Sequence, residues 1–279
     1  MPKLITTDAQ LRSLIPNQLA AVKGETSLFD KLVPFLDLAE QWVCDTFTSQ
    51  KTFDAICDLP DTTIFHVHVS RLVVADAMRR AIPSLDVVLT PNGFATVGTQ
   101  NLVTASKMRV DRLVGSMLAH RDECIAAMLP QMCAAPYWIF CSQADFFRRT
   151  LFNTLEVVDQ VPGNASSKWE RYLELRPQII DLEASLAEEW FSPELMENLR
   201  IENVSQDLVA ERKYVADQIK AQIVGYLKGG SFNSRRLADI VNYIRQREEE
   251  FAEWHGSETA KLFAPPVFRN KKKSSGYFF

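Results

Sequence analysis

Three segments of the first half of the chain recur, in the same order, in the second half. The pattern F-x-x-L-x-P followed by Glu40 matches Y-x-x-L-x-P followed by Glu183, at an offset of 143 residues (40 to 183). RLVVADAMRRAI, residues 71–82, matches RKYVADQIKAQI, residues 212–223, at an offset of 141 (71 to 212). A third match has an offset of 128 and pairs Ser106, Val110, Asp111 and Leu113 with Ser234, Ala238, Asp239 and Val241. These matches predict two related helical units, although amphipathic helices with similar apolar spacing can also align by accident.

The repeated segments have the apolar spacing of amphipathic helices. A second helix is expected over residues 61–82, with Asp61 as its N-cap and Pro83 at its end. A third is expected over residues 103–129, ended by Pro130. The first helix, residues 26–47, places apolar side chains three and four apart at Phe29, Leu32, Leu36, Ala39, Val43 and Phe47. The chain is therefore predicted to be mainly α.

The offset falls by 13 residues, from 141 to 128, across a stretch that contains VVLTPNGFATVG, residues 87–98. Its Pro-Asn-Gly sequence suits a tight turn, and β-forming residues stand on both sides. A phosphate-binding loop is less favoured, because Gly93 and Gly98 are separated by the strand-like run FATV rather than by further glycines. The sequence therefore predicts a β-hairpin at about residues 85–98, inserted in one copy of a duplicated unit.

Composition and charge exclude several classes of protein. The formal net charge of −4 predicts no general attraction to nucleic acid or to an anionic membrane. No apolar run has the roughly 18 residues that span a bilayer, and the N-terminus lacks the apolar segment of a signal peptide. The five cysteines form no C-x-x-C pair, so we interpret them as reduced core thiols. We expect a soluble protein made inside a cell.

Familiar catalytic and metal-binding patterns do not occur in the sequence. It contains no nucleophile elbow, no phosphate-binding P-loop and no G-x-G-x-x-G motif. His66 and His68 are the strongest metal candidates, but on a helix residues two apart point about 200° apart and cannot share an ion. Paired carboxylates such as Glu188 and Glu189 suit helix caps and solvated faces. We therefore expect no enzyme activity, no cofactor and no metal.

The C-terminal segment APPVFRNKKKSSGYFF reads as an arm. A solvated tail is the alternative, but three aromatic residues at a chain end are costly to leave in water and make good anchors in a neighbour's pocket. Its basic residues are candidates for contact with DNA: Arg269, Lys271, Lys272 and Lys273. The residues predicted to contact another subunit or partner are Val87, Leu89, Asn92, Gly93, Phe94, Pro265, Pro266, Tyr277, Phe278 and Phe279.

The predicted domain organisation has five segments. They are an extended N-terminal arm (1–24), helical unit 1 with the hairpin (25–141), a connecting helix from about residue 143 to 158 with a linker (142–163 in all), helical unit 2 (164–263) and a C-terminal docking arm (264–279).

Several of these segments together resemble a known group of proteins. The LITTDAQLRSLI arm, the F-x-x-L-x-P-x-L-x-L-A-E helix, the RLVVADAMRRAI helix and the partial second copy resemble an uncharacterised family encoded in the virion-structural clusters of phages and prophages. Residues 1–82 are more distantly similar to the head–tail connector (adaptor) proteins of tailed phages. That resemblance implies a ring beneath the portal, often dodecameric, with arms that grip neighbours and a hairpin near the DNA channel. The length and the duplication of this chain depart from a simple connector, and no catalytic residues carry over.

The sequence thus favours a non-enzymatic structural component of a tailed-phage virion, a neck ring protein that joins portal to tail. Such a protein is made in the host bacterial cytoplasm and ends in the virion. Its expected partners are further copies of itself, the portal protein, other neck or tail proteins and, non-specifically, passing DNA, but no membrane. A tail-completion protein belongs to the same class. The alternatives are a cellular helical-repeat scaffold that binds protein partners and, less favoured, an enzyme whose site the sequence does not reveal.

Overall fold

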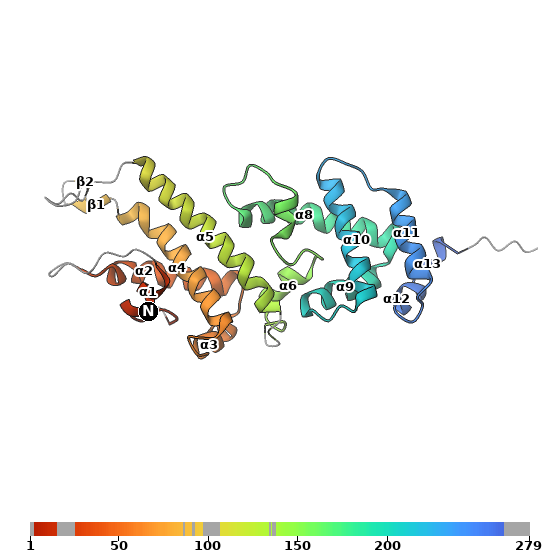
Figure 1. The fold of residues 1–279 in the computed structure, drawn as a ribbon, viewed down its shortest axis with the longest axis horizontal. Coiled ribbons are helices and arrows are strands. Elements are labelled where there is room, and N and C mark those ends of the chain that lie inside the picture. Colours follow the sequence, from red (N-terminus) through yellow and green to blue (C-terminus); the bar gives the residue numbers. More distant parts are fainter. Residues whose placement is uncertain are drawn as a thin grey trace, which may run out of the picture. The chain divides into compact units, whose positions relative to one another are not determined.

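A computed structural model describes residues 3–15, 26–85, 87–90, 93–96, 107–133, 135 and 138–264 (Figure 1). Helices make up most of this part of the chain, and the predicted mainly α class is confirmed. The chain divides into two compact units: unit 1 is Met1–Pro177 with Glu202–Asp207, and unit 2 is Gln178–Ile201 with Leu208–Phe279. The first division therefore falls inside a helix, whereas the sequence favoured a boundary at residues 163–164.

Unit 1 is organised around one long helix, α4. This helix has buried residues on all sides and contacts α1, α2, α3 and α5, as expected for a helix without a polar face. Figure 1 shows α5 running antiparallel beside it. The helices of unit 1 are α1 (Asp8–Leu14), α2 (Leu28–Thr46), α3 (Gln50–Cys57), α4 (Ile64–Leu85), α5 (Lys107–Cys133), α6 (Ser142–Arg148), α7 (Glu156–Gln160) and the first half of α8 (Lys168–Leu186).

The predicted amphipathic helix over residues 26–47 is confirmed as α2. It begins after Ser27, whose hydroxyl accepts a hydrogen bond from the backbone N–H of Asp30 at 3.1 Å. Its apolar stripe faces the core of unit 1, because Leu32, Leu36 and Val43 are fully buried. Burying a side chain of this kind contributes roughly 1.5–3 kcal/mol relative to leaving it in water.

Three predicted helix ends are wrong. Asp61 is not an N-cap, since α4 begins at Ile64 and the Asp61 carboxylate accepts a hydrogen bond from the Gln10 side chain at 3.3 Å. Pro83 and Pro130 lie inside the last turns of α4 and α5, which continue to Leu85 and Cys133. A proline so close to a helix end removes a single hydrogen bond and does not prevent the last turn from forming.

The helix predicted from Gln143 to Val158 is broken into α6 and α7. The carbonyl of Leu151 accepts a hydrogen bond from the Asn203 side chain at 2.8 Å, and that of Phe152 accepts one from the Tyr172 hydroxyl at 2.7 Å. These tertiary hydrogen bonds satisfy carbonyls that a continuous helix would bond internally. Packing within unit 1 therefore overrides the local helical pattern.

The expectation of an extended N-terminal arm is wrong for residues 3–15. They include α1, which has a capping box between Thr7 and Gln10, and Leu4, Ile5 and Leu11 are buried. The buried carboxylate of Glu40 in α2 accepts the backbone N–H groups of Lys3 and Leu4, each at 2.9 Å to its nearer oxygen. This segment is thus held against unit 1 by a carboxylate and a small apolar cluster.

Two short strands follow α4. β1 (Val87–Thr90) and β2 (Gly93–Thr96) pair antiparallel, with Leu89 opposite Phe94 and Thr90 opposite Gly93. The two residues that connect them, Pro91 and Asn92, lie outside the described residues.

Unit 2 is helical throughout its described part. A carboxylate–guanidinium pair joins α8 to α9, because Arg200 donates to the buried Glu183 at 2.8 Å. Arg212 donates to Glu253 at 2.6 Å and to the carbonyl of Glu250 at 2.7 Å, which ties α10 to the C-terminal helices. The elements of unit 2 are the second half of α8, a π-helix η1 (Ala187–Phe191), α9 (Pro193–Ser205, to Ile201), α10 (Ala210–Leu227), α11 (Ser234–Arg245), α12 (Ala252–His255) and α13 (Glu258–Leu262).

The buried Glu40 predicts a specific pH dependence of stability. Burial raises the pKa of Glu40, and the backbone N–H groups of Lys3 and Leu4 offset this only in part. An acid whose pKa is raised by folding stabilises the fold most below its unfolded pKa, and this contribution is lost as pH rises through the folded pKa.

We therefore expect the free energy of unfolding of the wild type, relative to that of Glu40→Gln, to increase as pH falls from 7 toward 4.5. The glutamine keeps one acceptor oxygen but cannot titrate, so other acids cancel in the difference. Urea unfolding at several pH values measures it, with the exposed neighbour Gln41→Glu as control. A difference that is constant with pH would show that Glu40 does not titrate as its burial requires.

Candidate functional site

The residues that the sequence predicted as contact sites fall at two places in the chain. Val87, Leu89, Gly93 and Phe94 lie in β1 and β2, where the structure gives their strand register. The remaining predicted contact and DNA-facing residues lie outside the described part of the chain; they are Asn92, Pro265, Pro266, Arg269, Lys271, Lys272, Lys273, Tyr277, Phe278 and Phe279. Their roles stay predictions.

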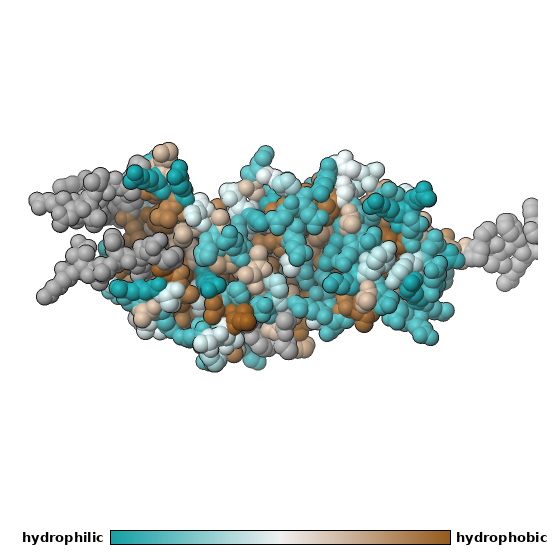
Figure 2. Space-filling view, in the orientation of Figure 1, coloured by the Kyte–Doolittle hydropathy of each residue, from teal (hydrophilic) through white to brown (hydrophobic). Residues whose placement is uncertain are grey.

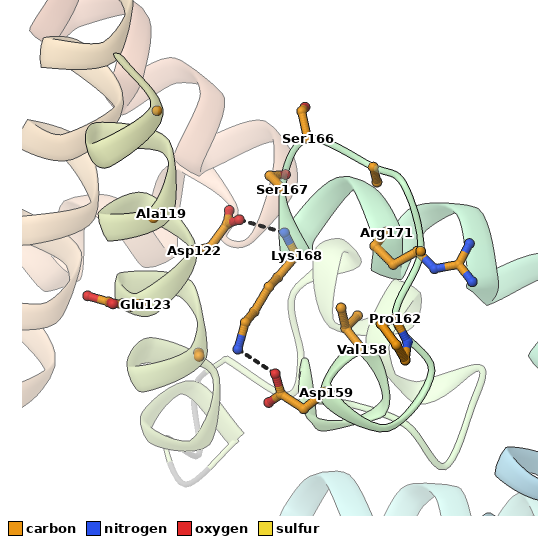
Figure 3. Close-up of a pocket in the computed structure, with 14 residues that line it drawn as sticks. Ala119, Asp122, Glu123, Val158, Asp159, Pro162, Ser166, Ser167, Lys168 and Arg171 are labelled. Carbon is orange, nitrogen blue, oxygen red and sulfur yellow. Dashed lines mark hydrogen bonds and ion pairs between the residues drawn. The ribbon is translucent and has the colours of Figure 1, made fainter. Parts of the chain in front are cut away.

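Unit 1 contains a polar hollow of about 530 Å³ that the sequence did not predict (Figure 3). It is lined by the middle of α5, by α7, by the loop of residues 162–167 and by the first turn of α8. Small residues of α5, including Gly115 and Ala119, leave the space open. The volume is in the range of roughly 300–1,000 Å³ that ligand pockets have, so its charged groups decide whether chemistry is feasible there.

Asp122 is the most buried ionisable residue that lines this hollow. Its carboxylate accepts the backbone N–H of Lys168 at 2.6 Å and a hydrogen bond from Arg121 at 3.2 Å. A helix start has unsatisfied N–H groups and a partial positive charge, so this carboxylate caps α8 from a different helix. Burial raises the pKa of Asp122, while Arg121 and the capped N–H oppose that rise.

The Asp122 contact continues into a buried charge network. Arg121 donates to the Ser167 hydroxyl at 3.1 Å and lies 3.8 Å from Asp76 of α4. Asp76 is fully buried and accepts hydrogen bonds from Arg79 at 2.9 Å and from Arg80 at 2.5 Å. We define Asp76, Arg121, Asp122 and Ser167 as the buried charge network. It joins α4, α5 and the start of α8.

The other charged side chains of the hollow also have structural partners. Lys168 reaches across to Asp159 of α7 at 2.5 Å, and Figure 3 shows Arg171 pointing away from Asp122. Arg171 pairs with Glu174 at 3.0 Å and packs against Gly163, where a side chain would collide with it. The anion-binding capacity of the α8 N-terminus is already used by Asp122. The charged groups Asp122 and Lys168 of the hollow therefore join α8 to α5 and α7.

The candidate metal ligands of the sequence do not come together. His66 is buried and its ring lies 3.4 Å from the Ser70 hydroxyl, whereas His68 is half-buried, and burial lowers the pKa of His68. Within the described ranges, no three His, Cys, Asp or Glu side chains are grouped so that they could hold a metal ion.

The five cysteines are free thiols, and Cys57 alone among them is not buried. Burial raises the pKa of Cys44 to about 11 and that of Cys133 to about 12. Since the thiolate is the reactive form, these two residues are unreactive at neutral pH. Four of the five cysteines are buried, as predicted for core thiols, whereas Cys57 is not. Their reduced state stays a prediction.

Unit 1 also has an aromatic hollow of about 500 Å³, which we define by Trp42 of α2, Phe146 of α6, and Trp169 and Leu173 of α8. Asp45, Thr46, Ser142 and Gln143 complete its lining. Most of the face seen in Figure 2 is hydrophilic, and hydrophobic residues gather there in small patches.

The rings of the aromatic hollow are fixed by the core beneath them. Phe47 packs against Trp42 at 5.4 Å and against Trp169 at 5.0 Å between ring centroids. The Arg176 guanidinium lies 3.7 Å from the Phe146 ring centroid. Aromatic and cation–π contacts of this kind contribute on the order of 1 kcal/mol each, so the hollow is preformed rather than collapsed.

Neither hollow could be predicted from a local sequence pattern. Asp76 did stand out, because it is one of the identical residues in the match of residues 71–82 to 212–223. The aromatic hollow, in contrast, combines residues more than a hundred positions apart on three helices, and no local pattern connects them.

The protein is therefore mainly helical, and buried charged side chains hold some of its helices together. A family model described as "Family of unknown function (DUF6712)" matches residues 17–148. The match ends with α6, so it includes Asp76, Arg121 and Asp122 but not Ser167 or Lys168. No curated protein and no solved structure matches the chain. Among the described helices, none has the length and apolar character that crossing a bilayer requires.

We expect Asp122→Ala to lower the free energy of unfolding by about 2–4 kcal/mol, because it removes one acceptor of the buried Arg121 guanidinium and the acceptor of the Lys168 N–H. Glu123→Ala is the matched control: Glu123 is the next residue of α5 but has an exposed side chain, and its removal should change stability by about 0.5 kcal/mol or less. Urea unfolding followed by tryptophan fluorescence measures both. Equal effects of the two substitutions would contradict a structural role of the buried charge network.

Proposed function

We propose that this protein is a non-enzymatic structural component that assembles with copies of itself and with other proteins. The observation that carries the proposal is the use of the ionisable groups in the polar hollow. Asp122, Lys168 and Arg171 all bond to other groups of unit 1, and Asp122 and Lys168 connect α8 to α5 and α7, which supports a structural role for them. The more specific proposal is a neck ring protein of a tailed phage that joins portal to tail, and it rests on the sequence resemblance.

A duplicated helical unit is part of this proposal. In support, α2 and α8 each contain a proline, Pro34 or Pro177, and each carries a buried glutamate, Glu40 or Glu183, at the same offset. The apolar residues at that offset are also buried in pairs: Leu32 with Leu175, Leu36 with Ile179 and Val43 with Leu186. The second match is less even, because Asp76 is fully buried whereas Asp217 is exposed.

The strands β1 and β2 and the C-terminal arm are the proposed contact devices. An isolated pair of four-residue strands is only marginally stable in water, so it requires cover from its own helices or from a neighbour. Under the proposed duplication this pair is an insertion that the second copy lacks. A net charge of −4 with a basic arm suits a ring that lets DNA pass without binding it tightly.

The full chain is expected to form a large homo-oligomer, alone or on a portal, and deletion of residues 265–279 should reduce it to smaller species. The reason is that the arm supplies aromatic anchors to a neighbouring subunit. Size-exclusion chromatography with light scattering measures the mass.

A variant with Lys271, Lys272 and Lys273 changed to alanine is the control, because it keeps the aromatic end and changes only charge. It should still assemble, although more weakly at low salt. A full chain that stays monomeric with and without a portal, and is indifferent to the deletion, would overturn the proposed function.

A further inference from the structure

The aromatic hollow of unit 1 has the properties of a docking site for an aromatic peptide. Its rings are already held in place by Phe47 and Arg176, so binding does not require the hollow to form first. Leu173 at its edge is 39% exposed although it is apolar. Aromatic residues, tryptophan above all, are enriched among the few residues that dominate binding energy at interfaces.

The charge of the aromatic hollow limits which class of ligand is complementary to it. Asp45 is the one ionisable residue of its lining, and it forms no ion pair with the described residues. A ligand that combines aromatic side chains with positive charge is therefore complementary, whereas an acidic peptide or a nucleic acid is not.

The chain itself contains a segment of this chemistry. Fifteen residues, 265–279, follow the last described residue, and they include four basic side chains and end in Gly-Tyr-Phe-Phe. Extended, fifteen residues span up to about 50 Å, which allows the aromatic end to reach a neighbouring subunit. About 500 Å³ lies in the range of pockets that hold small ligands and accommodates aromatic side chains.

We propose that the aromatic hollow binds the C-terminal arm of a second copy of the chain, with Tyr277, Phe278 and Phe279 against Trp42, Phe146 and Trp169 and the basic residues of the arm near Asp45. The proposal rests on the proposed function in one respect, that copies of the chain associate. It goes further by identifying the surface that receives the arm. The portal protein and other virion proteins are then not the receptors of this segment.

The test titrates a synthetic peptide of residues 264–279 into the chain that lacks residues 265–279 and measures affinity by isothermal titration calorimetry. We expect saturable binding with one site per chain. Leu173→Glu should weaken binding at least tenfold, because it places a charge at the apolar edge of the hollow. Leu38→Glu is the matched control: Leu38 is an exposed leucine of α2 that does not line the hollow, and its replacement should change affinity less than twofold.

Two further variants keep the test decisive if Leu173→Glu fails to fold. A peptide with Tyr277, Phe278 and Phe279 changed to alanine should not bind, and it leaves the protein untouched. Asp45→Lys, at an exposed position, should weaken binding about threefold or more at low salt, with the difference vanishing at high salt. No binding of the wild-type peptide, or equal binding by the Leu173→Glu and Leu38→Glu chains, would overturn the proposal.

Assembly of the full chain separates this proposal from the proposed function. If the full chain forms an arm-dependent oligomer that Leu173→Glu leaves intact, the arm docks elsewhere and the inference fails while the function stands. If the peptide binds the hollow but the full chain forms no oligomer, alone or on a portal, the proposed function fails. The aromatic hollow is then still the site that binds the arm. A third outcome is a full chain that stays monomeric and binds no added peptide at any concentration. In that case the arm occupies the aromatic hollow of its own chain, and the proposed exchange between copies is overturned.

Discussion

The structure of unit 1 depends on the pairing of buried charges between α4, α5 and α8. Asp76 is fully buried, and removing a carboxylate from water is affordable only where cations and hydrogen-bond donors surround it. Arg79, Arg80 and Arg121 supply them, and Arg121 passes the connection on to Asp122 and Ser167. Such a buried charge network adds little net stability compared with apolar packing, but its hydrogen bonds require specific geometry. It links one position of α5 to one position of α4, and Asp122 caps α8 at its first residue. The aromatic hollow depends on that start, because Trp169 and Leu173 lie in the first two turns of α8.

Periodicity predicted which segments are helical but not where several of them end. The apolar stripe of α2 is visible in sequence because Leu32, Leu36, Ala39 and Val43, all buried, are three or four positions apart. The ends of α4 and α5 differ from the prediction because Pro83 and Pro130 each remove only one hydrogen bond there, which is too little to end the helix. The break between α6 and α7 has the opposite cause. Its local pattern is helical, but Asn203 and Tyr172, which take the carbonyls of Leu151 and Phe152, are distant in sequence.

The same distinction applies to the candidate sites. A turn such as Pro-Asn-Gly or an aromatic chain end is a local feature, so sequence alone suggested the hairpin and the arm as contact devices. The hollows are tertiary features. Trp42, Phe146 and Trp169 each have the pattern of an ordinary core residue, and only the crossing of three helices leaves their rings around an open space. In the sequence, Asp122 likewise has the pattern of a charged residue on an exposed helix face. Only the structure shows that it accepts the Lys168 N–H. Sequence could propose the arm, but not its receptor.

Two buried glutamates show how the proposed copies have diverged. If α2 and α8 descend from one helix, the ancestral glutamate lay on a buried face and required partners in both copies. In unit 1 Glu40 accepts backbone N–H groups of Lys3 and Leu4, so it fastens the N-terminal segment. In unit 2 Glu183 pairs with the Arg200 guanidinium, so it fastens the following helix α9. A backbone partner constrains where a chain segment lies, whatever its side chains, whereas an arginine partner must be encoded at one position. Changes of side chain at residues 3 and 4 therefore leave the backbone partners of Glu40 in place, whereas a change at position 200 removes the guanidinium that pairs with Glu183.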